Sequence, residues 1–481
     1  MQNFIKPADN AFFRKNHLSI FSYFCPQLST MGKNKLGFVA VSAFVVANMI
    51  GTGVFTSLGF QLAGVPNPLA VLLLWVLGGM MALCGALVYG ELGATMPRSG
   101  GEYHYLSQIY HPALGFFSGW TSLTVGFAAP NAAACLALGY YFQGAFPHAS
   151  VKVIAAAALL LVTFVHSFTV RSGGVFQTVF TVCKVLLIIF LIFAGFFIAP
   201  VHQDLTPAFS SFTWRDVFSP AFAVSIVFVS LAYSGWNAAA YIANDIDKPQ
   251  RTLPRALLVG TLVVTLLYLL LNFIFLYTAP VEALKGVPDV AEVSATYIFG
   301  EYGGRLMSGI IAFLLISTIS AMSFVGPRVY QVMGEDFTLL RFMAFKNRSG
   351  VPIVSVWLQC ALSLLLICVS DLEQLIYFSG VPLNICTLLT VFGVFVHRRR
   401  YPDAPRPYKT WGYPVVPILF MIPVLWSLIY LFKQQPLEAL LGTATISLSF
   451  VLYAIGKWYE KRFPKTDALN ADFSKGGGHE H

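Results

Sequence analysis

Twelve apolar runs follow one another along the chain, separated by short polar connections. Each run approaches or exceeds the roughly 20 residues that a helix needs to cross a bilayer. The runs are continuous rather than alternating, which favours helices over the strands of a membrane barrel. We therefore predict an all-α polytopic membrane protein with twelve transmembrane helices, at residues 36–62, 67–90, 112–143, 150–170, 174–200, 216–246, 254–280, 303–328, 351–370, 373–397, 413–433 and 437–457.

Two of these runs are interrupted near their centres. The first contains Ile50-Gly51-Thr52-Gly53, and the sixth contains Ala232-Tyr233-Ser234-Gly235-Trp236-Asn237. Glycine lets the backbone leave the helical conformation, and such breaks occur in membrane helices where they line a cavity. An unwound helix offers free amides to an anion and free carbonyls to a cation, so the breaks predict a site for a zwitterion such as an amino acid. The alternative is that the glycines are packing notches between helices.

Composition and charge agree with a membrane protein and orient it. The chain is 57% apolar and only 11% charged, outside the range of soluble domains. With the N-terminus in the cytoplasm, twenty-four of the thirty Lys and Arg residues fall on the cytoplasmic side. The positive-inside rule then predicts a multi-pass protein of the cell membrane with both termini cytoplasmic. The net charge of +9 is mostly this bias, so it does not indicate nucleic-acid binding.

Lys184 is the one cation deep inside a run, because the other Lys and Arg residues within the runs lie near their ends. It lies about ten residues, or ~15 Å at 1.5 Å per residue, into the fifth run. A Lys at that depth costs on the order of 3 kcal/mol unless it is paired or neutral. We therefore expect its side chain to face the interior of the bundle and to have a functional role.

Other chemistry has little support. The chain has no GxxxxGK[ST] phosphate loop, no His/Glu metal spacing and no Ser-His-Asp pattern, so neither an ATP-driven pump nor an enzyme is indicated, and no metal or cofactor is expected. Its seven cysteines form no CxxC pair and are typical of small buried side chains. A channel would need a polar stripe or rings of charge, which the apolar runs lack.

Four motifs together resemble the amino acid–polyamine–organocation superfamily. They are the Gly51-Thr52-Gly53 break, the connection from Tyr89 through Pro97-Arg98-Ser99-Gly100-Gly101-Glu102-Tyr103, the sixth-run break with its continuation to Pro254-Arg255-Ala256, and Pro405-Arg406-Pro407-Tyr408-Lys409-Thr410-Trp411-Gly412-Tyr413-Pro414. The last is most similar to the L-type amino-acid transporter branch and its bacterial relatives. The resemblance covers nearly the whole chain.

The resemblance implies a LeuT-type fold of two inverted five-helix repeats whose first and sixth helices are broken. The repeats would span residues 36–200 and 216–397, followed by two peripheral helices in 398–462. A cytoplasmic N-terminal extension, 1–35, and a disordered cytoplasmic tail, 463–481, would flank them. Met31, directly before the first run, is an alternative start to Met1, and the sequence leaves the two open.

The resemblance also implies roles for residues at the breaks. Amides around Gly51, Thr52 and Gly53 would bind the substrate carboxylate, and carbonyls near Ile50 and Ala232 would bind its ammonium. The remaining implied substrate-binding residues are Tyr233, Ser234, Gly235, Trp236 and Asn237. Aromatic anchoring and helix packing are the alternative for these side chains. Leu231 stands where L-type relatives tend to carry a gating Phe, which puts the aromatic gate and the substrate size in doubt.

Lys184 acquires a specific role from the resemblance. In sodium-independent relatives, a Lys at this position of the fifth helix stands in for the sodium ion between the first and eighth helices. Its ammonium would bind carbonyls near Met49 and hydroxyls such as Ser320.

At the cytoplasmic end, opposite charges on Glu91, Arg98 and Asp245 would form a latch that closes the inward path. The alternative is that they are solvated loop charges, whose interactions are worth under ~1 kcal/mol.

These patterns predict a sodium-independent secondary transporter of amino acids that works by alternating access, as an exchanger or a proton symporter. A polyamine or other amine permease and a non-transporting membrane nutrient sensor are the alternatives. The expected partners are an amino acid, protons if transport is proton-coupled, and the lipid bilayer.

Eukaryotic L-type relatives use a cysteine in the loop after the third helix to bind a heavy subunit. Residues 143–150 contain none, so no disulfide-linked heavy subunit is expected.

Overall fold

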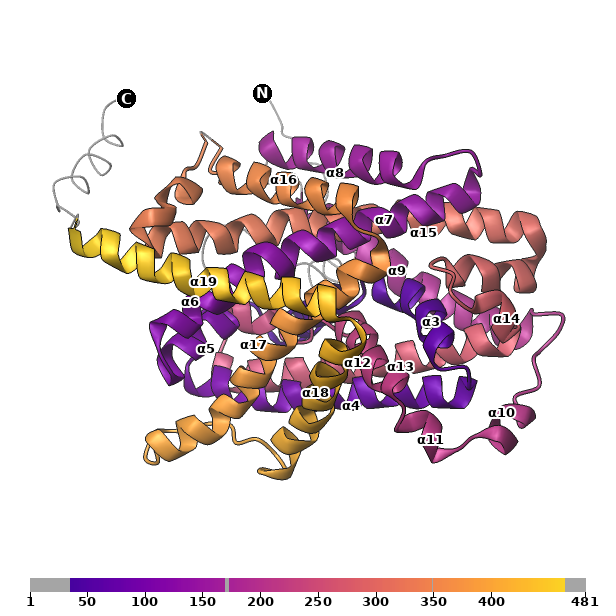
Figure 1. Ribbon diagram of the computed structural model, residues 1–481, viewed down its shortest axis with the longest axis horizontal. Helices are drawn as coiled ribbons and strands as arrows, with labels where there is room; N and C mark the ends of the chain where they lie inside the picture. The colour runs from indigo at the N-terminus through magenta and orange to yellow at the C-terminus, as the bar shows by residue number, and fades with distance from the viewer. Residues whose placement is uncertain (1–34, 169–172, 348, 463–481) are drawn as a thin grey trace, which may run out of the picture.

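The computed structural model describes residues 35–168, 173–347 and 349–462 (Figure 1). In this part of the chain the regular elements are helices, apart from a single backbone bridge between Leu36 and Ile246. The predicted tail and, apart from Lys35, the predicted N-terminal extension lie outside the described residues. The helices are α2 (Phe38–Met49), α3 (Gly53–Gly64), α4 (Pro68–Thr95), α5 (Gly101–Ile109), α6 (Pro112–Thr121), η1 (Ser122–Phe127), α7 (Ala128–Ala145), α8 (Val151–Phe168), α9 (Gly173–Phe197), α10 (Thr206–Ser211), α11 (Trp214–Val217), α12 (Pro220–Ala232), η2 (Ala238–Asp245), α13 (Pro249–Thr278), α14 (Val281–Leu284), α15 (Val290–Asp336), η3 (Thr338–Ala344), α16 (Ile353–Val369), α17 (Leu372–Arg400), α18 (Val415–Gln434) and α19 (Pro436–Arg462).

The membrane-spanning elements follow the order of the apolar runs. Among the described residues, nine helical segments are long and apolar enough to cross a bilayer, with α6, η1 and α7 counted as one. The bent pair α2 and α3 supplies a tenth candidate, and the shorter apolar helices α12 and α16 occupy the sixth and ninth predicted positions. The prediction of an all-helical polytopic membrane protein is confirmed. The count of twelve spans and the inverted repeat remain predictions.

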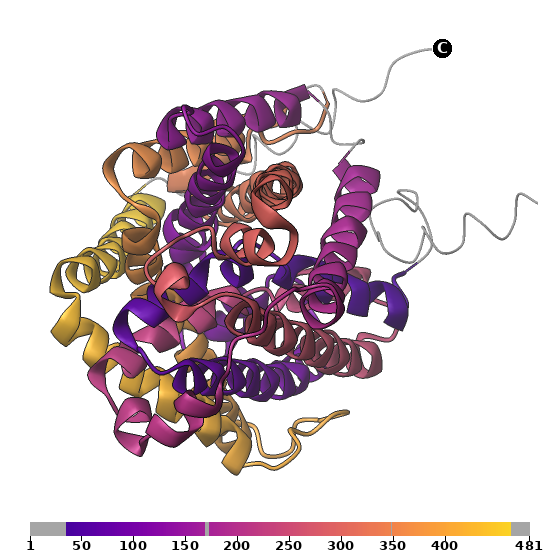
Figure 2. The ribbon, with the colours of Figure 1, turned by 90° about the vertical axis from the view of Figure 1, so that its right-hand side faces the viewer.

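The helices pack in two groups. One group consists of α2, α3, α4, α12 and α13, and the other of α7, α8, α15 and α16. Figure 1 shows the second group above the first, and the view turned by 90° in Figure 2 keeps them on opposite sides. Helix α9 contacts both α13 and α15, and α17 contacts both α12 and α7. Helices α9 and α17 therefore bridge the two groups, which also touch directly where α15 contacts α3 and α13. The helices interrupted by the two predicted breaks belong to the first group.

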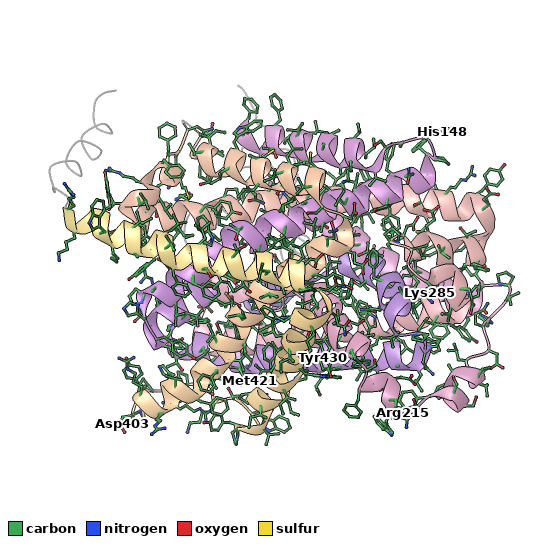
Figure 3. All side chains as sticks on the ribbon, in the orientation of Figure 1. His148, Arg215, Lys285, Asp403, Met421 and Tyr430 are labelled. Atoms are coloured by element: carbon green, nitrogen blue, oxygen red, sulfur yellow. The ribbon has the colours of Figure 1, made fainter. Side chains whose placement is uncertain are left out.

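Loops that the charge pattern assigned to opposite membrane faces lie at opposite ends of the long axis. Figure 3 shows His148, Arg215 and Lys285 toward one end and Asp403 at the other. With the N-terminus inside and twelve spans, the loops between the fifth and sixth and between the seventh and eighth runs, which contain Arg215 and Lys285, are predicted to lie outside, and the connection after the tenth run, which contains Asp403, inside. The structure thus separates these loops as the prediction requires, while the choice of cytoplasmic end rests on the positive-inside rule.

Candidate functional site

The first break separates α2 from α3. Helix α2 ends at Met49, α3 begins at Gly53, and their axes differ by 42°. Within the break the Gly51 amide donates to the Met49 carbonyl at 2.8 Å. The first amides of α3 have no intrahelical acceptor, and those of Gly53 and Val54 donate to no other residue that the structure describes. A helix N-terminus with free amides attracts a carboxylate.

The second break follows α12, which ends at Ala232. The backbone turns through Tyr233–Asn237, with Gly235 at φ +95°, and continues as the 3-10 helix η2. This break touches the first one at two places. A Cβ at Gly53 would lie 2.5 Å from Ala232 Cα, and a Cβ at Gly235 would lie 2.5 Å from the Asn48 carbonyl oxygen. The two interruptions therefore form one joint that only glycine permits at these positions.

Side chains of the second break have partners within the protein. Tyr233 Oη donates to the Trp75 carbonyl at 3.2 Å, and the Trp236 ring lies 4.7 Å from the Tyr89 ring, edge to face. Asn237 Nδ2 donates to Glu102 at 3.1 Å. These contacts are those expected if the aromatic residues pack against helices, so a substrate pocket lined by them remains a prediction. Of the two other predicted residues here, Ser234 is exposed and Leu231 is half-buried.

Lys184 lies in α9 and connects the first break to α15. Its side chain is 2% exposed. Its ammonium donates to Thr318 Oγ1 at 2.7 Å and to the Ile50 carbonyl at a longer 3.4 Å. Among the described residues no carboxylate pairs with it. Through these two contacts Lys184 ties the end of α2 to α15.

The structure does not bring Lys184 into contact with the other two residues proposed for it. Ser320 bonds to His166 of α8 at 2.8 Å. Residues two apart on a helix project about 200° apart, so Thr318 and Ser320 face different neighbours. The Met49 carbonyl accepts from Tyr268 Oη at 2.7 Å and from the Gly51 amide. The hydropathy of the sequence does not indicate whether Thr318 or Ser320 accepts a hydrogen bond from the Lys184 ammonium.

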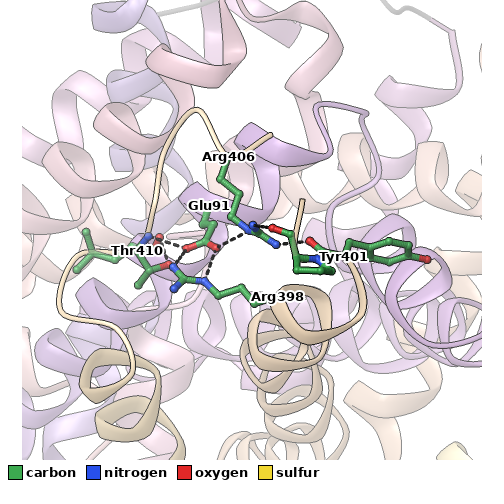
Figure 4. Close-up of polar contacts among 7 residues, drawn as sticks. Glu91, Arg398, Tyr401, Arg406 and Thr410 are labelled. Carbon is green, nitrogen blue, oxygen red and sulfur yellow. Dashed lines mark hydrogen bonds and ion pairs between the residues drawn. The ribbon is translucent and has the colours of Figure 1, made fainter. Parts of the chain in front are cut away.

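Glu91, near the end of α4, is held by partners that the sequence did not indicate. Its carboxylate accepts from Arg398 of α17, Nε at 2.8 Å and Nη2 at 2.6 Å, and from the Thr410 amide at 2.6 Å (Figure 4). Arg406 Nε lies 3.9 Å away, and Arg398 stacks on the Tyr413 ring at 3.7 Å. Two partners of Glu91, Arg406 and Thr410, belong to the Pro405–Pro414 motif, as does Tyr413, which contacts Arg398. The sequence had given this motif no structural role. The motif fastens the end of α4 to α17.

The latch predicted among Glu91, Arg98 and Asp245 is not formed. Glu91 pairs with Arg398 and Arg406, and none of the ion pairs among the described residues involves Arg98 or Asp245. The segments that carry Arg98 and Asp245 are joined by neutral groups instead. The Asn244 amide donates to Ser99 Oγ at 3.0 Å, and the Ser99 amide donates to Asn244 Oδ1 at 3.4 Å. The Leu36 amide also donates to the Asp245 carbonyl at 2.8 Å. Charge complementarity in the sequence could not reveal that Arg398, 307 residues away, competes for Glu91.

Replacing Glu91 with Gln is expected to destabilise the fold. The carboxylate is 2% exposed, and its loss leaves Arg398 without its bidentate acceptor. Breaking such a pair costs about 3 kcal/mol or more. Glu460→Gln is the control, because the Lys457–Glu460 pair lies at the surface, with Lys457 exposed, and is worth under ~1 kcal/mol. Thermal unfolding of the purified variants measures the difference, and equal Tm values for both would contradict the structural role of Glu91.

Paired helix breaks beside a buried ammonium are typical of proteins that bind a solute at the middle of the membrane. The fold and this site define a membrane transport protein. The described part of the chain contains no group of three or more His, Cys, Asp or Glu residues that could hold a metal ion.

Comparison with known proteins identifies the family. The family described as amino acid permease matches residues 36–454, so the chain belongs to the amino acid permease family. Large neutral amino acids transporter small subunit 2 of Mus musculus is 28% identical over 462 residues, covering 89% of this chain and 82% of that protein. The serine/threonine exchanger SteT of Bacillus subtilis is 28% identical over 393 residues, covering 80% and 88%. The b(0,+)-type amino acid transporter 1 of Mus musculus is 28% identical over 414 residues, covering 84% and 82%. The chain is thus a permease of the L-type branch and not an enzyme.

Proposed function

We propose that this protein is a sodium-independent secondary transporter of amino acids in the cell membrane, acting by alternating access as an exchanger or a proton symporter. Relatives named as amino-acid transporters and exchangers support the solute class. The observation that carries the proposal is the Lys184 ammonium between Ile50 and Thr318. A fixed cation at this position supplies the charge that a sodium ion would bring, so transport needs no sodium.

The proposed substrate site lies at the joint of the two breaks. The carboxylate binds amides around Gly51, Thr52 and Gly53, together with the Val54 amide, at the start of α3, where the helix dipole is positive. The ammonium binds carbonyls at the ends of α2 and α12, near Ile50 and Ala232. Thr52 and Gly53 are half-buried and Ser234 is exposed, which leaves this part of the joint accessible to a solute.

Alternating access is proposed to move the first helix group against the second. Lys184 on α9 then acts as a tether, because it bonds to one residue of each group. The twelve-span LeuT-type arrangement and cytoplasmic termini belong to this proposal. The separation of the Arg215 and Lys285 loops from the Asp403 loop supports it (Figure 3).

The purified chain should transport amino acids on its own. The loop at residues 143–150 contains no cysteine through which a heavy subunit could be disulfide-linked. The test is uptake of a panel of radiolabelled amino acids and polyamines into proteoliposomes, with and without internal amino acid and with and without a pH gradient. Stimulation by internal amino acid indicates exchange, and stimulation by an inward proton gradient indicates symport. Uptake of polyamines alone, or uptake only after a partner protein is added, would contradict the proposal.

A further inference from the structure

A second buried charged group lies beside the site, on the short helix α5. Glu102 is 5% exposed and accepts two hydrogen bonds on the same carboxylate oxygen. Tyr89 Oη of α4 donates at 2.6 Å, and Asn237 Nδ2, at the end of the second break, donates at 3.1 Å. The Tyr89 ring also packs against Trp236. The carboxylate therefore contacts α4 and the second break at once.

The surroundings of Glu102 contain no cation. The titratable groups that face it from the packed elements are Tyr89 of α4, Tyr105 of its own helix, Tyr241 of η2 and Cys386 of α17. The hydroxyls of Ser118 and Thr121 on α6 lie near Cys386 and are neutral. Arg98 and Asp336 interact with Tyr103 instead. Among the described residues Glu102 has no ion pair, so a negative charge there is balanced only by two neutral donors.

Such an environment favours the neutral acid. A carboxylate removed from water without a cation is costly, and proton uptake relieves that cost. Burial raises the pKa of Glu102 to about 7, while the hydrogen bonds from Tyr89 and Asn237 lower it. Water entering between α5 and η2 would remove the burial and lower the pKa again. The proton is therefore bound in the packed arrangement and released in a hydrated one.

We propose that Glu102 is a proton-binding site of the transporter, separate from Lys184, and that its protonation favours the arrangement in which α4, α5 and the second break are packed together. A proton from water adds to the carboxylate and gives the carboxylic acid, with no other reactant. This inference rests on the proposed transport function. It assigns the pH dependence of transport to Glu102 of α5. The two groups that donate hydrogen bonds to this carboxylate connect it to the second break, because Asn237 directly precedes η2 and the Tyr89 ring packs against Trp236.

The sign of the effect follows from linkage. The packed arrangement holds the proton more tightly, so acid pH favours it, by up to about tenfold in population per pH unit for a single proton. Uptake by the wild-type protein should therefore change several-fold between about pH 6 and about pH 8, most steeply near the pKa. Glu102→Gln, which keeps the shape of the neutral acid, should show a flat profile.

Tyr89→Phe tests the same site through a shift in the pH midpoint of uptake. The variant removes a hydrogen bond that stabilises the carboxylate, so the midpoint of the profile should move to higher pH. A purely structural role for Glu102 predicts no such shift. Glu460→Gln, which changes a half-buried carboxylate on α19 that pairs with Lys457, is the control and should keep the wild-type profile.

The outcomes separate this inference from transport itself. An unchanged midpoint in Glu102→Gln, or a flat wild-type profile, would overturn the proton site and leave transport standing. Lower affinity for cationic amino acids alone, with the midpoint unchanged, would instead make Glu102 a substrate-binding residue. Infrared difference spectra of the purified proteins provide a readout that needs no uptake: a carboxyl band that titrates near the pKa in wild type and is missing in Glu102→Gln supports the proton site. Persistence of that band in Glu102→Gln would overturn it.

Discussion

Lys184→Ala is expected to lower amino-acid uptake by about tenfold or more, a loss of ~1.4 kcal/mol or more in the transport step. Removing the ammonium leaves the Ile50 carbonyl and Thr318 Oγ1 without their shared donor. The first break is then no longer tied to α15, and the hinge populates unproductive arrangements. Because the site is small and its remaining groups are neutral, the protein should still fold.

Uptake into proteoliposomes and size-exclusion profiles of the purified variant measure the two expectations. Lys457→Ala, which changes an exposed lysine on α19, is the matched control and should transport normally. Thr318→Val should share part of the defect, because it removes one acceptor of the ammonium. The residual flux of Lys184→Ala should keep its pH dependence if Glu102 holds the proton. Near-normal uptake in Lys184→Ala would show that the lysine is a packing residue.

Alanine at either glycine of the joint is expected to abolish most transport. At Gly53 the new Cβ would lie 2.5 Å from Ala232 Cα. At Gly235 it would lie 2.5 Å from the Asn48 carbonyl oxygen, on a backbone whose φ of +95° disfavours any side chain. Both obstacles are backbone atoms, so the breaks must move apart. Overpacking of this kind costs about 1–3 kcal/mol, enough for a loss of about tenfold in uptake.

Gly309→Ala is the control for both variants. Its Cβ would meet only the Ala145 side chain, at 3.7 Å, so stability and uptake should stay close to wild type. Binding of a radiolabelled substrate to the purified proteins separates a damaged site from a slowed conformational change. If Gly53→Ala and Gly235→Ala transported as well as Gly309→Ala, contact between the two breaks would have no part in transport.

Much of the fold could be predicted because the bilayer imposes simple requirements. Continuous apolar runs located the membrane helices. The glycine pair Gly51 and Gly53 located the end of α2, and the polar interruption with Gly235 located the turn after α12. The depth of Lys184 in its run correctly implied that it faces the interior, because hydrocarbon cannot solvate an ammonium. Each inference needed only neighbouring residues and the properties of the solvent.

The partners of these residues could not be predicted in the same way. Whether Lys184 meets Thr318 or Ser320 depends on the rotation of α15 about its axis, to which hydropathy is insensitive. Glu91 had nearer candidate partners in the sequence than Arg398, and only the packing of α4 against α17 brings the two together. Glu102 was part of a recognised motif, but its burial beneath Asn237 follows from the course of the second break.

The central claim is that Lys184 makes amino-acid transport independent of sodium. The most direct test measures initial uptake of a radiolabelled amino acid by proteoliposomes containing the purified chain, in sodium medium and in medium with sodium replaced by choline. Equal rates in the two media, both well above those of protein-free liposomes, are the predicted result. A rate that falls several-fold when choline replaces sodium would contradict the claim.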